Sequence, residues 1–120
     1  VLNCHMGILP TYRGMDCVSW AILNNDINNI GLTVHFMDEG IDTGDIINRK
    51  RIDVSGVSNF SDIEPMLEYH MPKIVVDSVV EISKKEISPL KQKLDDGKQF
   101  YIANQNIKEV AKSYFNKINN

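Results

Sequence analysis

The stretch from residue 32 to residue 54 constrains the fold most, because two strand-like segments flank a short polar loop. In residues 32–37, apolar side chains alternate with a second set, which is the period of a β-strand. The apolar set is Leu32, Val34 and Phe36. Residues 38–44 are too polar and glycine-rich to continue the strand, so they are expected to form a tight loop. Residues 45–54 resume a strand, which is predicted to pair with the first.

Helices are expected before and after this strand pair. A helix over about 17–24 has apolar residues at i, i+3 and i+4, and Asp16 is its candidate N-cap. A longer helix is predicted over 59–84, where Pro65 fits the first turn and Pro72 is expected to kink or divide the segment. The elements therefore predict an α/β fold with a short central sheet and helices packed against it.

The two ends of the chain have patterns of their own. Residues 1–6 form a mainly apolar run typical of a buried strand, and residues 7–14 form a shaped loop with one proline and two glycines. The last stretch, about 104–118, is amphipathic and is expected to be helical. We therefore divide the chain into a main unit, residues 1–88, and a short tail, residues 89–120, that contains this last helix.

The composition limits the class of protein. The length of 120 residues is enough for one domain with a modest core. The chain is 42% hydrophobic and 24% charged, an ordinary balance for a globular protein. The net charge of −3 does not favour phosphate binding, so nucleic acid is not an expected partner. No apolar run approaches the roughly 20 residues of a membrane span, and no secretory leader is visible. Cys4 and Cys17 are expected to be buried free thiols, which fits a cytoplasmic protein without membrane association.

Asn3 and His5 form a candidate catalytic pair. They are two residues apart on the expected first strand, so their side chains leave the same face about 6–7 Å apart. An amide N–H donates to a carbonyl oxygen that gains negative charge, and an imidazole exchanges a proton near neutral pH. The same spacing is also common among purely structural residues, so both interpretations stay open on spacing alone.

Asp42 is the candidate third member of this site. It lies in the polar loop between two glycines, which let a backbone fold closely around a ligand. Its carboxylate is suited to orient His5 or raise the pKa of that ring, while a simple turn cap is the alternative role. His35 is expected to be a hydrogen-bonded structural histidine and His70 a solvated one. The cysteines and histidines lack the paired spacing of a zinc site, so no metal is expected.

Two segments resemble the signatures of the 10-formyltetrahydrofolate-dependent formyltransferases. Residues 3–14, Asn-Cys-His-Met-Gly-Ile-Leu-Pro-Thr-Tyr-Arg-Gly, resemble the family's Asn-x-His…Leu-Pro…Arg-Gly signature. Residues 31–47, Gly-Leu-Thr-Val-His-Phe-Met-Asp-Glu-Gly-Ile-Asp-Thr-Gly-Asp-Ile-Ile, resemble its second signature. The resemblance covers residues 1–55 well and 56–85 by helix placement. One departure is Gly7, where many members of the family have serine.

The resemblance implies a set of functional residues. Asn3, His5 and Asp42 match the family's catalytic residues, and 10-formyltetrahydrofolate is the implied cofactor, acting as formyl donor. Tyr12 and Arg13 are expected to bind the substrate, although pairing within the fold is an equally open role for Arg13. The implied folate-binding residues are Ile8, Leu9 and Pro10 at the formyl site and Asp38, Glu39, Gly40 and Ile41 at the pteridine pocket.

The implied fold is the C-terminal half of a Rossmann-like formyltransferase domain, a mixed sheet with flanking helices in which residues 32–37 and 45–54 are antiparallel neighbours. The chain begins within a strand-like run, as a piece of a longer protein does, and the family's front half is missing. An unpaired sheet edge is therefore expected, which favours self-association or pairing with a missing N-terminal half.

The expected function is formyl transfer to a small-molecule amine acceptor, with an amino-sugar nucleotide as the first candidate. Four alternatives stay open: a methionyl-tRNA formyltransferase, a glycinamide ribonucleotide formyltransferase, a formyltetrahydrofolate hydrolase, and a non-catalytic fragment. Whether the fragment is active on its own is open as well.

Overall fold

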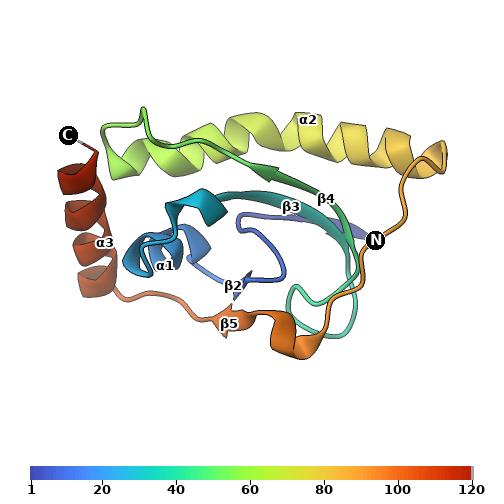
Figure 1. Cartoon of the computed structure of the whole chain (residues 1–120), viewed down its shortest axis with the longest axis horizontal. Helices are drawn as coiled ribbons and strands as arrows, with labels where there is room; N and C mark the ends of the chain where they lie inside the picture. The colour runs from blue at the N-terminus through green and yellow to red at the C-terminus, as the bar shows by residue number, and fades with distance from the viewer. Residues whose placement is uncertain (120) are drawn as a thin grey trace.

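The computed structural model describes residues 1–119 and contains a three-stranded antiparallel sheet (Figure 1). Its strands lie in the order β1 (Leu2–His5), β3 (Gly31–Phe36) and β4 (Ile46–Arg51). The antiparallel pairing of β3 with β4 confirms the expected arrangement around the polar loop. β4 ends before the expected residue 54, because Asp53 starts a turn in which its carboxylate accepts the Ser55 N–H at 2.9 Å.

The middle strand, β3, is covered on both faces. Leu32 and Val34 are fully buried, and so is Thr33, which points to the opposite face. Helix α2 packs against β3 and β4, while Thr33 hydrogen-bonds to the loop that contains Gly7 and Leu9. The polar side chains of this strand are therefore held inside the protein, although the alternating pattern alone is typical of a strand with one solvent-facing side.

Helix α2, Ile63–Ser83, is one continuous element along the sheet (Figure 1). Pro72 lies inside the helix and does not divide it, so of the two expected outcomes, a kink or a division, the division is excluded. Proline removes one backbone donor, but Pro72 is exposed, so water is available to the carbonyl that loses its partner. Ile74 and Leu67 anchor the buried side of the helix on the core.

The C-terminal segment returns to the other side of the sheet. Its short strand β5, Lys98–Phe100, pairs in parallel with β2, Tyr12–Gly14. Helix α3, Gln105–Ile118, then packs on α1, Cys17–Leu23, which confirms the helix expected near residues 104–118. β2 lies in the stretch expected to be a loop, because its partner strand comes from more than 80 residues later in the chain. Short 3-10 turns complete the chain at Ile27–Asn29, Phe60–Asp62 and Leu94–Asp96.

Asp16 precedes α1 but does not cap it through its side chain. Its backbone is left-handed, with φ of 55°, and its carboxylate bonds elsewhere. Oδ2 accepts the N–H of Ala103 at 2.9 Å, and Oδ1 lies 3.6 Å from Nζ of Lys108. The expected N-cap is thus a connection between α1 and the C-terminal segment.

The described residues combine antiparallel and parallel strand pairing with three α-helices, which confirms the α/β class. Cys17 is buried, whereas Cys4 is only half-buried, and both are free thiols. None of the described helices has the length and apolar character needed to cross a membrane.

Candidate active site

The pairing of β1 with β3 builds one half of the site. The antiparallel register sets Asn3 opposite His35 and His5 opposite Thr33. Asn3 and His5 leave the same face of β1, as their two-residue spacing predicts. Asn3 is exposed, and its Nδ2 lies 3.4 Å from Nε2 of His35. An amide is therefore available to a ligand at the edge of a pair of imidazoles.

Asp42 completes the cluster from the loop between β3 and β4. Its Oδ2 lies 3.5 Å from Nδ1 of His5, and its Oδ1 lies 3.3 Å from Nε2 of His35. The N–H of Gly14 donates to Oδ2 at 2.9 Å. The backbone of Asp42 has φ of 54°, a conformation that is costly for any residue but glycine and that persists where surrounding contacts hold it.

The ring of His5 has a defined orientation. Its Nε2 lies 2.8 Å from the carbonyl oxygen of Tyr12, which only accepts, so Nε2 carries a proton. In the neutral ring, Nδ1 then faces Asp42 with a free lone pair. Gly7 leaves space for this orientation, because a Cβ there would lie 2.6 Å from Nε2. A serine at this position would require the ring to shift.

The pKa values of the three ionisable groups shift in different directions. Burial lowers the pKa of His5 below 6.5 and outweighs the raising effects of Asp42 and a backbone carbonyl. Burial also lowers the pKa of His35, but its hydrogen bond to Asp42, a backbone carbonyl and nearby carboxylates raise it above 6.5 overall. Burial raises the pKa of Asp42, yet the hydrogen bond from His35, the charge of His5 and a backbone N–H hold it below 3.8. Asp42 is therefore ionised at neutral pH, and His35 binds a proton more readily than His5.

His35 is also a member of the cluster, although the sequence pattern predicts a structural role for it. Its side chain is buried at 2% exposure, and its Nδ1 donates to the carbonyl of Phe36 at 2.9 Å. This bond directs Nε2 towards Asp42 and Asn3. The signal that points to His35 is its place in the same signature segment as Asp42, on the strand that runs into the loop.

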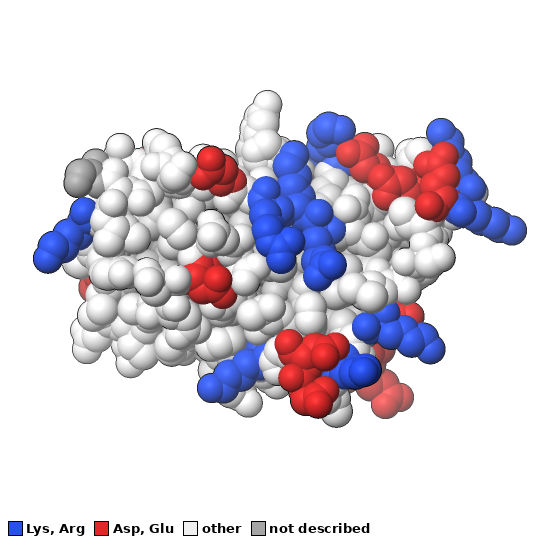
Figure 2. All heavy atoms as spheres, in the orientation of Figure 1, with Lys and Arg blue, Asp and Glu red and all other residues white. Residues whose placement is uncertain are grey.

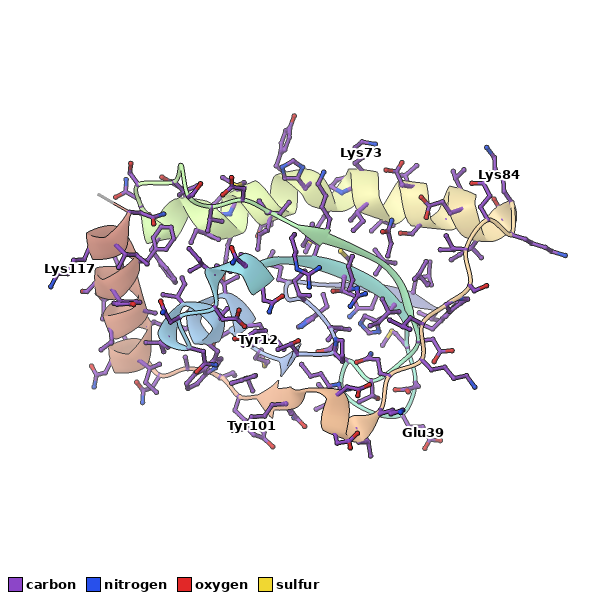
Figure 3. The ribbon with its side chains drawn as sticks, in the orientation of Figure 1. Tyr12, Glu39, Lys73, Lys84, Tyr101 and Lys117 are labelled. Carbon is purple, nitrogen blue, oxygen red and sulfur yellow. The ribbon has the colours of Figure 1, made fainter. Side chains whose placement is uncertain are left out.

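Tyr12 and Arg13 are both buried, which for Arg13 matches the alternative of pairing within the fold, and the substrate-binding role of either stays a prediction. Tyr12 is 2% exposed, and its hydroxyl donates to Asp26 at 2.8 Å (Figure 3). Its ring stacks on Phe100 with centroids 5.1 Å apart. Arg13 is 3% exposed, and its guanidinium donates to acceptors in residues 92–94. Within this chain, both side chains are therefore occupied by contacts of the fold itself.

The residues expected at the formyl site form a firm wall beside the sheet. Ile8 and Leu9 are almost completely buried, and Pro10 is half-buried. The N–H of Leu9 donates to Oγ1 of Thr33 at 3.1 Å, and its carbonyl accepts Nη1 of Arg49 at 3.1 Å. The backbone of this segment is thus fixed on the same strand that carries His35.

The residues expected at the pteridine pocket lie in the exposed loop after β3, with Glu39 at its outer side (Figure 3). Asp38 shapes the loop, because its Oδ1 accepts the N–H of Gly40 at 2.9 Å and the hydroxyl of Thr43 at 2.7 Å. Ile41 is 54% exposed. The loop therefore presents an apolar side chain and backbone groups next to Asp42.

A hollow of 210 Å³ reaches the ring of His5 from the side of α1 and α2. Asp16, Cys17 and Glu64 are among its lining residues. The Sγ of Cys17 lies 3.7 Å from Nε2 of His5, but burial, together with nearby carboxylates, raises the pKa of this thiol to about 12, so it is not a thiolate nucleophile. The described residues contain no group of three or more His, Cys, Asp or Glu side chains placed to hold a metal ion.

Sequence comparison places the chain in a family. The family model described as "Formyl transferase" matches residues 1–79. A methionyl-tRNA formyltransferase from Clostridium novyi is 33% identical over 100 residues, which are 83% of this chain and 31% of that protein. The chain belongs to the formyl transferase family. It spans about a third of the length of the curated relatives that it matches.

Solved structures of formyltransferases share the fold. The formyltransferase PseJ from Anoxybacillus kamchatkensis, in complex with UDP-4,6-dideoxy-4-formamido-L-AltNAc and tetrahydrofolate, has a TM-score of 0.72 at 24% identity and covers 84% of this chain and 52% of its own. An N-formyltransferase from Helicobacter canadensis, in complex with folinic acid and dTDP-3-aminofucose, has a TM-score of 0.72 at 26% identity and covers 84% and 37%. These matches confirm the expected Rossmann-like formyltransferase fold.

Proposed function

We propose that the protein transfers a formyl group from 10-formyltetrahydrofolate to the amine of a small-molecule acceptor, with an amino-sugar nucleotide as the first candidate. The observation that carries the proposal is the convergence of Asn3, His5 and Asp42. These residues come from a strand end and a distant loop, yet Asp42 lies 3.5 Å from His5. An amide donor, a neutral imidazole and an ionised carboxylate together fit acyl transfer to an amine.

Each group has a separate role in the reaction. The exposed amide of Asn3 donates to the oxygen of the formyl group as the amine attacks and that oxygen gains negative charge. Because burial lowers the pKa of His5, its neutral Nδ1 is available to take the proton that the attacking amine releases, and the ionised Asp42 then stabilises the charged ring. The bond between the formyl carbon and the nitrogen of the donor then breaks, and that nitrogen takes up the proton from His5.

The chain offers suitable surroundings for the formyl donor. The loop Asp38–Ile41 presents backbone groups and an exposed isoleucine, a combination that suits a flat heterocycle with a polar edge. Residues 8–10 form the wall on the other side of β3, where they would restrict the formyl group. Both solved relatives described above contain a reduced folate compound, which supports the assignment of these residues to the donor.

The hollow beside His5 supports an amine acceptor. Its lining includes Asp16 and Glu64, and carboxylates attract a cationic amine before it loses its proton. The relatives from Anoxybacillus kamchatkensis and Helicobacter canadensis are each solved with a nucleotide-linked sugar, which makes an amino-sugar nucleotide the first compound to test.

Methionyl-tRNA is the second candidate acceptor. The relative from Clostridium novyi described above, at 33% identity, has the name methionyl-tRNA formyltransferase. Arg49, Lys50 and Arg51 are exposed at the end of β4, and Figure 2 shows basic side chains gathered near the middle of that face. A basic cluster of this kind is suited to phosphate groups.

The test combines one donor with several acceptors. The 120-residue chain is mixed with 10-formyltetrahydrofolate and with dTDP- or UDP-amino sugars, methionyl-tRNA or water alone. The same mixtures are made with the longer protein if the coding region upstream of Val1 adds residues. Mass spectrometry of the formylated product and a formate assay give the result. We expect a formylated amino sugar. Formyl-methionyl-tRNA would favour the second candidate, formate without an acceptor would indicate a hydrolase, and no product with any acceptor in either form would contradict the proposal.

A further inference from the structure

We propose that Gln92, which lies between α2 and β5, is a positioning residue that holds the backbone of Asp42 in place for the reaction. The inference rests on the proposed function in one respect only, namely that Asp42 serves the reaction. Gln92 is outside both signature segments, 50 residues after Asp42 in the chain. The C-terminal segment thereby becomes part of the catalytic structure.

The side-chain amide of Gln92 joins two parts of the site. Its Nε2 donates to the carbonyl oxygen of Asp42 at 2.9 Å and to that of Gly44 at 2.6 Å. Its Oε1 accepts Nε of Arg13 at 3.1 Å and Nη2 of the same residue at 2.9 Å. The orientation of the amide is fixed chemically, because a guanidinium only donates and backbone carbonyls only accept. All the hydrogen-bonding capacity of this amide is used.

Arg13 supports Gln92 from the opposite side. Its guanidinium is buried, and it donates to the carbonyls of Lys93 at 2.8 Å and Leu94 at 3.1 Å. These bonds fix the backbone around Gln92 on β2. Upstream, the backbone of Leu90 exchanges two hydrogen bonds of 2.7 Å with Ile46 at the start of β4. The segment from residue 90 to residue 94 is thus tied to both strands next to the loop of Asp42.

The loop of Asp42 depends on such support. Its left-handed φ of 54° is unfavourable without surrounding contacts, and its carboxylate must meet two imidazoles and the N–H of Gly14 together. Gly44 packs so closely that a Cβ there would lie 1.7 Å from the carbonyl oxygen of Phe36. The carboxylate is held by Gly14 and the carbonyl by Gln92, so loss of Gln92 releases one side of the loop.

Amide hydrogen exchange measured by NMR on the 120-residue chain tests this role without any substrate. The N–H of Gly14 reports the position of the Asp42 carboxylate, whereas the neighbouring N–H of Met15 bonds to the carbonyl of Phe100 at 3.1 Å and reports only the pairing of β2 with β5. In Gln92→Met, which keeps the length of the side chain, we expect Gly14 to exchange about tenfold faster, the equivalent of one lost hydrogen bond. Met15 should exchange as in the wild type.

Two further variants make the result specific. Gln99→Met makes the same change on exposed β5 and should leave both amides unchanged. Gln92→Glu keeps an acceptor for Arg13 but loses the donor to Asp42, so it should also accelerate Gly14 alone, and it decides the question if Gln92→Met does not fold. Unchanged exchange at Gly14, or equal acceleration of Gly14 and Met15, would overturn the proposal.

A kinetic measurement then links the position to the reaction. If the proposed formyl transfer is observed, Gln92→Glu should lower kcat with little change in KM for the donor, because it displaces Asp42 and leaves the loop residues 38–41 in place. The two proposals can also fail separately. If Gly14 exchanges faster in the Gln92 variants but the wild type shows no detectable formyl transfer, Gln92 still supports Asp42, and only the proposed function is contradicted.

Discussion

At the residue scale, one buried hydroxyl connects the loop beside His5 to the middle of the sheet. Thr33 is 0% exposed, donates to the carbonyl of Gly7 at 2.7 Å and accepts the N–H of Leu9 at 3.1 Å. The loop therefore follows β3 on the side where His35 meets Asp42. A side chain of the same shape without the hydroxyl would leave both backbone groups unpaired.

Thr33→Val should lower the free energy of unfolding by about 1–3 kcal/mol, since two buried backbone groups lose their partner. Urea denaturation followed by circular dichroism measures the change. Thr11→Val, at an exposed position of the same loop, is the control and should change the free energy by no more than about 0.5 kcal/mol. Equal effects of the two substitutions would contradict the role given to Thr33.

The pair of Asp42 and His35 makes stability depend on pH in a defined window. The folded-state pKa of His35 is raised, so its contribution is complete below 6.5 and is lost as the pH rises through the raised value. The folded-state pKa of Asp42 is lowered, so its contribution is present above 3.8 and is lost as the pH falls through the lowered value. His5 and Asp38 are the other charged or titratable groups that act on His35 or Asp42. The pair therefore stabilises the fold most between pH 3.8 and 6.5.

Asp42→Asn should lower the pKa of His35, because burial then acts without the opposing carboxylate. NMR titration of the histidine ring protons measures this value directly. The difference in unfolding free energy between wild type and variant should be largest between pH 3.8 and 6.5 and should narrow on both sides. Asp95→Asn, at an exposed position outside the cluster, is the control. A pKa of His35 that stays the same in Asp42→Asn would contradict the proposed pairing.

The sequence predicts the three main site residues but not all of their surroundings. Asn3 and His5 follow from strand periodicity, and Asp42 from a glycine-flanked loop, together with the family signatures. His35 escapes the pattern because β3 is covered on both faces, so a polar position on that strand is still an interior one. Pairing of Arg13 within the fold is one of the two roles left open, but its acceptors escape the pattern because residues 92–94 are about 80 positions away in the chain.

At the element scale, the C-terminal segment, residues 89–119, contacts the main unit through both of its regular elements. β5 pairs with β2, and α3 packs on α1 and buries Ala111 and Phe115. Local patterns predict α3 from its amphipathic period but do not predict β2 or β5, each of which has three residues. Strands this short form only because a distant partner supplies the hydrogen bonds.

Gly97→Ala should separate β5 from the loop before β2. A Cβ at Gly97 would lie 1.5 Å from the carbonyl oxygen of Pro10, and a backbone oxygen has little freedom to move away. We expect a loss of about 1–3 kcal/mol in the free energy of unfolding, the usual scale of an overpacked contact. Gly56→Ala is the matched control, since nothing lies within 4 Å of a Cβ there. Equal stability of the two variants would show that the close approach at Gly97 is not important.

At the scale of the whole molecule, the division into residues 1–88 and 89–120 stays a prediction that truncation tests. In a chain that ends at Ser88, Tyr12 loses the stacked ring of Phe100, and α1 loses the cover of α3. We expect such a chain to lose cooperative unfolding in urea, while a control chain that ends at Asn119 keeps it, because Asn119 donates to the carbonyls of Val54 and Val57. A cooperative transition of unchanged midpoint in the shorter chain would instead support two separate units.

The rate of formyl transfer by Asn3→Ala tests the central claim most directly. The substitution removes an exposed amide beside the two imidazoles and leaves the strand backbone intact. With 10-formyltetrahydrofolate and the acceptor that the formylation assay identifies, kcat should fall at least ~100-fold, the scale of one lost oxyanion donor. Asn106→Ala, at an exposed position of α3, should keep the wild-type rate. Near-normal turnover of Asn3→Ala in a correctly folded protein would contradict the account.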